Sequence, residues 1–159
     1  MTTIHVAGGV GVAPTEMSAY DAALADANLH NYNLITVSSV IPADGRLEVV
    51  DAAPDLGPAG NRLTVVQGKV VAGPDSDGEP ITTGVGWATG PGPGLFYEAS
   101  GSDPEAVEAE IWRGLAAGCE LRDWELTDRD VLVSTAEPVD GSYTSAVVLA
   151  AYGESEPIL

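Results

Sequence analysis

The sequence predicts a single layered α+β domain. Two segments show the apolar spacing of helices, and seven or eight segments are rich in the β-branched and apolar residues typical of strands. Turns between them are expected because 19 glycines and 11 prolines are spread along the 159 residues. A chain of this length holds one hydrophobic core, and helices that cover the faces of a sheet give a layered arrangement.

The beginning of the chain is expected to form a strand, a helix and a second strand. The strand at residues 4–6 is followed by a glycine-rich run at 7–11, which we interpret as a structural turn. It resembles a phosphate-binding loop only loosely, because no lysine follows and the glycine spacing is incomplete. A helix is expected at about 15–28 and a strand at 34–40, with a turn at Asp44-Gly45. The helix has four apolar residues at helical spacing: Met17, Tyr20, Leu24 and Ala27.

The middle of the chain is expected to alternate strands with loops. Proline, glycine and aspartate cluster at residues 53–60 and 73–80, the second cluster being interpreted as solvated surface. These two loops flank a predicted strand pair around residues 63–71. Two more strands, at 84–89 and 95–99, are separated by a turn that is rich in glycine and proline.

A second helix and three strands complete the prediction. The helix begins at Ser102-Asp103-Pro104-Glu105, with Ser102 as the cap, a proline in the first turn and a glutamate three residues after the serine. Gly118 is expected to close it. Its apolar face contains Val107, Ile111 and Leu115. The strands are expected near residues 119–126, 131–136 and 143–151, with a hairpin turn at Asp140-Gly141 between the last two.

The charge balance is strongly acidic. Six basic residues face 24 acidic ones, for a net charge of −18, which repels nucleic acids and anionic lipids. Such self-repulsion is screened in concentrated salt, so we expect a salt-adapted protein from a halophile. The chain has no run of eighteen apolar residues and no basic, apolar leader, so we expect a soluble cytoplasmic protein.

The serine pair Ser38-Ser39 is the main candidate for chemistry. It follows a strand rich in β-branched residues, and Pro42 then removes a backbone donor, so the serines lie where a strand ends. A hydroxyl held there can attack its own backbone. The single cysteine, Cys119, is interpreted as a buried structural thiol. His5 and His30 lack metal-ligand spacing, so no metal site is expected.

Residues 33–42, with the sequence NLITVSSVIP, resemble the cleavage segment of the pyruvoyl-dependent arginine decarboxylases of archaea. Three further segments resemble the same family in the same order: AYDAAL at 19–24, GLFYE at 94–98 and GCELRDWEL at 118–126. The resemblance implies the αββα sandwich of the pyruvoyl-dependent histidine and arginine decarboxylases.

The resemblance also implies a self-made cofactor. The bond between Ser38 and Ser39 is expected to break, leaving a β chain of residues 1–38 and an α chain of residues 39–159 that starts with a covalent pyruvoyl group derived from Ser39. Asn33 matches an asparagine proposed to stabilise the oxyanion during processing, a task that suits a side-chain amide. A hydrogen bond at the start of the strand is the alternative role for Asn33.

The implied reaction converts L-arginine to agmatine and carbon dioxide through a Schiff base to the pyruvoyl group, an early step towards polyamines. Glu98 matches the family's general acid, and its place after an apolar strand predicts partial burial. Asp21 matches the residue that binds the guanidinium group. Family members are trimers with active sites between subunits, so a homotrimer of αβ units is expected. The segments at 53–62 and 73–80 do not align clearly with the family.

Two alternatives remain open from the sequence. The first alternative to an arginine decarboxylase is a non-processing acidic binding module, in which the serine pair only ends a strand. The second is a pyruvoyl-dependent decarboxylase of another amino acid. Neither nucleic acid nor membrane is expected as a partner, because the net charge of −18 repels both.

Overall fold

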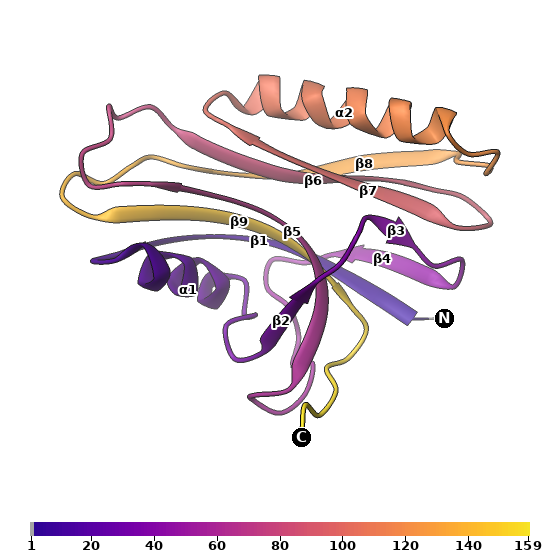
Figure 1. Cartoon of the computed structure of the whole chain (residues 1–159), viewed down its shortest axis with the longest axis horizontal. Coiled ribbons are helices and arrows are strands. Elements are labelled where there is room, and N and C mark those ends of the chain that lie inside the picture. The colour runs from indigo at the N-terminus through magenta and orange to yellow at the C-terminus, as the bar shows by residue number, and fades with distance from the viewer. Residues whose placement is uncertain (1) are drawn as a thin grey trace.

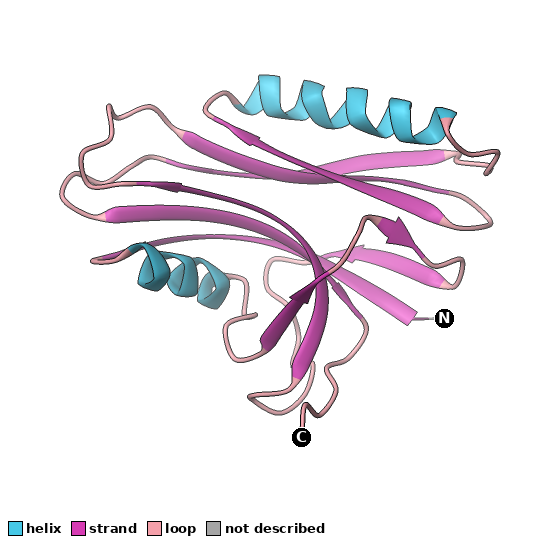
Figure 2. Cartoon of the chain, viewed as in Figure 1, coloured by secondary structure: helices cyan, strands magenta, loops and turns pink. Residues whose placement is uncertain are grey.

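The computed structural model, which describes residues 2–159, has four layers in the order helix, sheet, sheet, helix (Figure 1). Helix α1, at Glu16–Asp26, covers the outer face of a five-stranded sheet. Helix α2, at Pro104–Glu120, covers the outer face of a four-stranded sheet. The two sheets pack face to face between the helices (Figure 2). The predicted αββα sandwich is therefore confirmed.

The five-stranded sheet is mixed and has the order β2-β5-β9-β1-β4. Strand β2 is parallel to β5 and β4 is parallel to β1, whereas β9 is antiparallel to both of its neighbours. Its strands are β1 at Thr2–Ala13, β2 at Asn33–Thr36, β4 at Gly45–Val49, β5 at Arg62–Ala72 and β9 at Tyr143–Tyr152.

The four-stranded sheet is antiparallel throughout and has the order β3-β7-β6-β8. Its edge strand β3 contains only two residues, and it is the next strand after β2 along the chain. The strands are β3 at Val40–Ile41, β6 at Ile81–Thr89, β7 at Gly94–Gly101 and β8 at Asp128–Ala136. Consecutive strands β2 and β3 therefore belong to different sheets.

The fold has four apolar clusters, and the three larger ones fill the spaces between the layers. The first lies between α1 and the five-stranded sheet and includes Ala23 and Leu63. The second lies between the sheets and includes Val66 and Phe96, and the third lies under α2 and includes Ile111. Each strand of the five-stranded sheet that feeds two clusters alternates its side chains between them, as the pleat requires.

The glycine-rich run at residues 7–11 is part of β1 and not a turn, so our interpretation of it was wrong. Its glycines let α1 approach the strand closely. A Cβ at Gly11 would lie 2.3 Å from the Ala23 nitrogen, and one at Gly9 would lie 2.2 Å from the Ala23 oxygen. Backbone contact with α1 occupies the space that a bound phosphate would need on this face.

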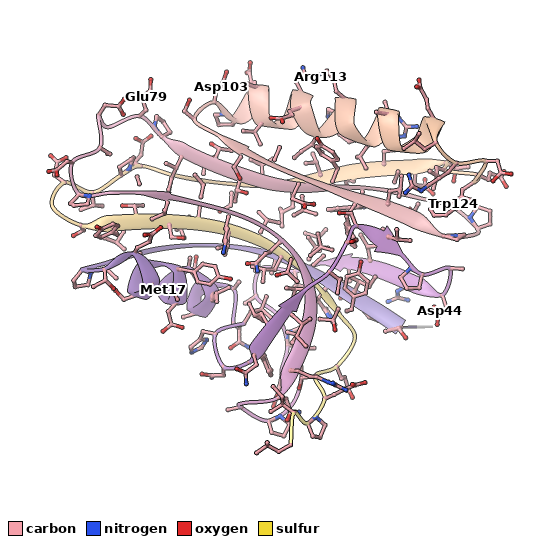
Figure 3. All side chains as sticks on the ribbon, in the orientation of Figure 1. Met17, Asp44, Glu79, Asp103, Arg113 and Trp124 are labelled. Atoms are coloured by element: carbon pink, nitrogen blue, oxygen red, sulfur yellow. The ribbon has the colours of Figure 1, made fainter. Side chains whose placement is uncertain are left out.

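The helices differ from the prediction mainly at their ends. Asp103, not Ser102, caps α2, and its Oδ1 accepts from the Glu105 N–H at 3.1 Å. The helix continues past Gly118 to Glu120, so the strand predicted at 119–126 is absent and the chain there completes the helix and enters a loop. In α1, Met17 is 74% exposed, although its spacing placed it on the apolar face; it is labelled in Figure 3.

Three predicted strand arrangements also change. The expected pair at residues 63–71 is the single long strand β5, and the expected strand at 34–40 is divided between β2 and β3. The turn at Asp140-Gly141 is present, but it joins β8 to β9 in the other sheet and is no hairpin. Within residues 2–159, none of the helices has the length and apolar character needed to cross a bilayer.

Candidate active site

Ser38 and Ser39 lie where the chain crosses from one sheet to the other. On the upstream side, the Val37 N–H donates to the Val65 carbonyl at 3.0 Å, which extends the pairing of β2 with β5. On the downstream side, the Phe96 N–H donates to the Ser39 carbonyl at 2.8 Å, which begins the pairing of β3 with β7. The peptide bond between the two serines therefore spans the boundary between the two hydrogen-bonded layers.

The hydroxyl of Ser39 contacts the carboxylate of Glu98. Ser39 Oγ donates to Glu98 Oε2 at 3.3 Å, although the two residues are 59 positions apart in the chain. Strand β7 makes this contact possible: Phe96 packs between the sheets, and Glu98, two residues later, lies on the same face. The partial burial expected of Glu98 is not present in the single chain, where its side chain is exposed beyond the end of the apolar cluster.

Tyr152, near the end of β9, supports the downstream side of the crossing. Its hydroxyl donates to the Val40 carbonyl at 3.0 Å, and its ring meets Phe96 edge-on, with centroids 6.0 Å apart. Burial, and to a smaller extent the nearby Glu98 carboxylate, raise the pKa of Tyr152 to about 12. The hydroxyl therefore stays protonated and remains a donor at neutral pH. No sequence signal identified this residue, because its role depends on a contact across 112 positions.

A cavity of about 640 Å³ opens beside the serine pair, on the side of α2. Its lining includes Ser38, Ser39, Tyr97 and Arg122. The Arg122 guanidinium donates to the Gly118 carbonyl at 2.9 Å and lies 5.2 Å from the centroid of the Trp124 ring. The GCELRDWEL segment therefore contributes to this cavity from the end of α2 and the loop that follows.

Asp21 and Asn33 lie together, at a different cavity. Both line a space of about 650 Å³ beside α1, in which Asp21 is exposed. The Asn33 Nδ2 donates to the Gly60 carbonyl at 2.8 Å, which corresponds to the alternative role of a hydrogen bond at the start of a strand. Within one chain, Ser39 therefore contacts Glu98, whereas Asp21 and Asn33 line a separate cavity.

A short chain of hydrogen bonds connects α1 to the strand before the serines. The Tyr20 hydroxyl donates to Gln67 Oε1 at 2.6 Å, and Gln67 Nε2 donates to Thr36 Oγ1 at 2.9 Å. Burial raises the pKa of Tyr20, and the hydrogen bond to Gln67 partly offsets this. Lys69 lies over the Tyr20 ring, with Nζ 5.0 Å from its centroid. The second cavity is thus connected to the last residues of β2.

Of the other titratable residues considered in the sequence, His30 lines the second cavity together with Asp21 and Asn33, whereas His5 and Cys119 line neither of the two cavities. Cys119 is partly buried against the cluster under α2, and Arg129 Nη2 lies 3.8 Å from its sulfur. Over residues 2–159, no three histidine, cysteine, aspartate or glutamate side chains form a group that could hold a metal ion.

The layered fold and the Ser39-Glu98 pair at the crossing between the sheets agree with the resemblance to the pyruvoyl-dependent decarboxylases. The family model described as pyruvoyl-dependent arginine decarboxylase matches residues 3–157. This chain belongs to that family.

Relatives with the name pyruvoyl-dependent arginine decarboxylase match along most of their length. The protein of Halobacterium salinarum strain R1 is 52% identical over 161 residues, which cover 99% of this chain and 98% of the relative. The protein of Thermococcus sibiricus is 33% identical and that of Pyrococcus furiosus 31% identical, each over 143 residues that cover 87% of this chain and 88% of the relative. The resemblance found in the sequence is therefore confirmed, and family membership implies a covalent pyruvoyl group derived from a serine.

Proposed function

We propose that this chain cleaves itself between Ser38 and Ser39 and then converts L-arginine to agmatine and carbon dioxide. The observation that carries the proposal is the hydrogen bond from Ser39 Oγ to Glu98 Oε2, 3.3 Å long, at the crossing between the sheets. It places a hydroxyl nucleophile beside a proton acceptor at a peptide bond whose two sides are held by different layers. Arginine as the substrate follows from the family and from the names of the relatives.

Self-cleavage uses only groups of this chain and one water. Ser39 Oγ attacks the Ser38 carbonyl carbon, its proton passes to Glu98, and the C–N bond breaks as the nitrogen of residue 39 takes up a proton, which leaves an ester. Loss of the α-proton of residue 39 then breaks the Cβ–Oγ bond, and Ser38 departs as a carboxylate. Hydrolysis of the resulting dehydroalanine consumes the water, releases ammonia and leaves the pyruvoyl group.

The surroundings of residue 39 fit a pyruvoyl group. The Phe96 N–H already holds the carbonyl of residue 39, and Tyr152 holds the next carbonyl, so this end of β3 has anchors that cleavage does not remove. The cavity of about 640 Å³ leaves the position accessible. A pyruvoyl group supplies a carbonyl that binds the substrate amine and withdraws electrons as carbon dioxide leaves. Glu98 then donates the proton that replaces the lost carboxylate.

We assign the binding of the substrate's guanidinium group to Asp21 of a neighbouring subunit. Aspartate pairs with guanidinium in a directional, charge-assisted manner. Asp21 and Asn33 share one cavity, whereas Ser39 lines another and contacts Glu98, so a site that uses all four requires two copies of the chain. A homotrimer with sites between subunits meets this requirement, and its interface would bury Glu98. Asn33 would then reach the serine pair of the next subunit as an oxyanion donor.

Intact-mass spectrometry tests the cleavage. Protein purified and kept in molar KCl is expected to give two chains, residues 1–38 and a larger chain that begins with pyruvoyl at position 39. Ser39→Ala is the matched control and should remain a single chain of 159 residues. A wild-type protein that folds in molar KCl but stays intact contradicts the proposal and favours a non-processing binding module.

Carbon dioxide release across a panel of amino acids tests the substrate. L-Arginine is expected to react fastest, with agmatine as the product, in a cytoplasmic enzyme that works at high salt. Cleaved protein that prefers another amino acid would contradict the proposed substrate but not the proposed cleavage.

Equilibrium sedimentation of the same sample should give the mass of three αβ units, and a monomer with full activity would contradict the shared site.

A further inference from the structure

The carbonyl of Ser38 already accepts a hydrogen bond in the uncleaved chain. Its donor is the backbone N–H of Val40, at 3.1 Å, so the bond closes a three-residue turn around Ser39. Ser39 keeps a negative φ, as the common form of this turn requires. The atom that would carry the negative charge during self-cleavage is therefore held by a group two residues ahead.

The Val40 N–H is free for this role because of the strand register. In an antiparallel pair, positions that exchange hydrogen bonds alternate with positions that do not. The Phe96 N–H bonds the Ser39 carbonyl, so Ser39 and Phe96 form a bonded position. Val40 pairs with Leu95 at the next position, where the N–H points away from β7. It points instead to the scissile carbonyl.

The position of Val40 is held from two directions. Its own carbonyl accepts from the Tyr152 hydroxyl at 3.0 Å, and the preceding carbonyl accepts from the Phe96 N–H at 2.8 Å. These contacts come from two strands, β9 and β7, which belong to different sheets. The donor is therefore fixed before the reaction, which is the condition under which an oxyanion donor lowers a barrier.

We infer that the Val40 N–H stabilises the oxyanion that forms at Ser38 during self-cleavage. As Ser39 Oγ adds to the carbonyl carbon, the C=O bond opens to a single bond and its electron pair moves onto the Ser38 oxygen. The pair returns when the C–N bond breaks and the nitrogen of residue 39 takes up a proton. The hydrogen bond strengthens while the charge is present. This inference rests on the proposed cleavage, and it adds a donor from the same chain to any supplied by Asn33.

A backbone ester at position 40 tests the inference directly. Incorporation of the α-hydroxy analogue of valine removes the N–H and keeps the side chain. The same replacement at Ile41, one residue further along β3, is the control for a weakened strand. Protein collected in urea and refolded into molar KCl is followed by intact-mass spectrometry, which distinguishes a break between residues 38 and 39 from hydrolysis of the introduced ester.

The ester at position 40 is expected to slow self-cleavage by about 100-fold or more, as removal of one oxyanion donor does in other enzymes. The ester at position 41 should cleave within a few-fold of the wild type. Val40→Pro, which lacks the N–H, should cleave as slowly as the ester at position 40. Val40→Ala, which keeps the N–H, should cleave like the ester at position 41. Normal cleavage with the ester at position 40, or equal slowing by both esters, overturns the inference. Failure of the wild type to cleave would instead overturn the proposed function on which it rests.

Discussion

Gly11→Ala should separate α1 from β1. The added Cβ would lie 2.3 Å from the Ala23 nitrogen, 2.6 Å from the Ala22 carbonyl carbon and 2.7 Å from the Ala19 oxygen. Ordinary contact begins at 3.4 Å, so the helix must move by about 1.1 Å or the strand must bend. All three atoms belong to the backbone, and therefore no side chain can rotate to relieve the overlap.

The expected cost is about 3 kcal/mol, at the upper end of the usual range for overpacking. For a domain of this size it corresponds to a fall in melting temperature of about 6–12 °C. Gly92→Ala is the matched control, because a Cβ there meets nothing within 4 Å. Its effect should be less than about 1 kcal/mol in either direction. The assay is urea unfolding at fixed KCl and protein concentration, since an oligomer's stability depends on both.

The same change should also weaken arginine use, because Asp21 lies on the displaced part of α1. A shift of about 1 Å in a positioning group can cost roughly 100-fold in rate. A Gly11→Ala protein with wild-type stability, within about 0.5 kcal/mol, would refute the close approach of helix and strand. Lost stability with unchanged kcat/KM for arginine would instead show that α1 does not contribute to the substrate site.

Three other predictions concern charge. Asp21→Asn should lower kcat/KM for arginine, with a loss of transition-state stabilisation of about 2 kcal/mol or more. Unchanged kinetics would show that Asp21 is not part of the substrate site. Because the pKa of Tyr152 is raised to about 12, its contribution to stability is present below pH 10 and is lost as pH rises towards 12. Tyr152→Phe should abolish this loss, as measured by the free energy of unfolding against pH. An unaltered pH profile would contradict the prediction. The melting temperature should rise steeply from low to molar KCl, because salt screens the repulsion that a net charge of −18 causes. The described residues form only two exposed ion pairs, Arg46–Glu48 and Arg62–Glu156. A flat response would contradict salt adaptation.

Much of the fold could be predicted because it depends on local patterns. The proline and acidic residues before Val107, with Ile111 and Leu115 at helical spacing, placed α2 correctly except at its ends. The glycines of β1 could not be interpreted in this way. Glycine favours a turn when only neighbours in sequence are considered, whereas here Gly9 and Gly11 are needed for contact with a helix that follows later in the chain.

The candidate site could likewise be predicted only in part. Ser39 and Glu98 were chosen from their resemblance to a family, and the structure brings them to 3.3 Å. Tyr152 and the Val40 N–H had no sequence signal. A tyrosine in a strand and a backbone N–H occur throughout proteins, and only the meeting of β9 with the start of β3 gives them a role.

The sequence by itself determined the layered class of the fold, the acidic surface and the serine pair at the end of a strand. These depend on the period of apolar residues, on composition and on a contiguous motif, all of which are local. Tertiary structure decided that the serine pair joins two sheets, that Glu98 meets Ser39, and that Asp21 and Asn33 line another cavity. Those facts depend on which strands pair and in which register, and pairing energy comes from contacts between residues far apart in the chain.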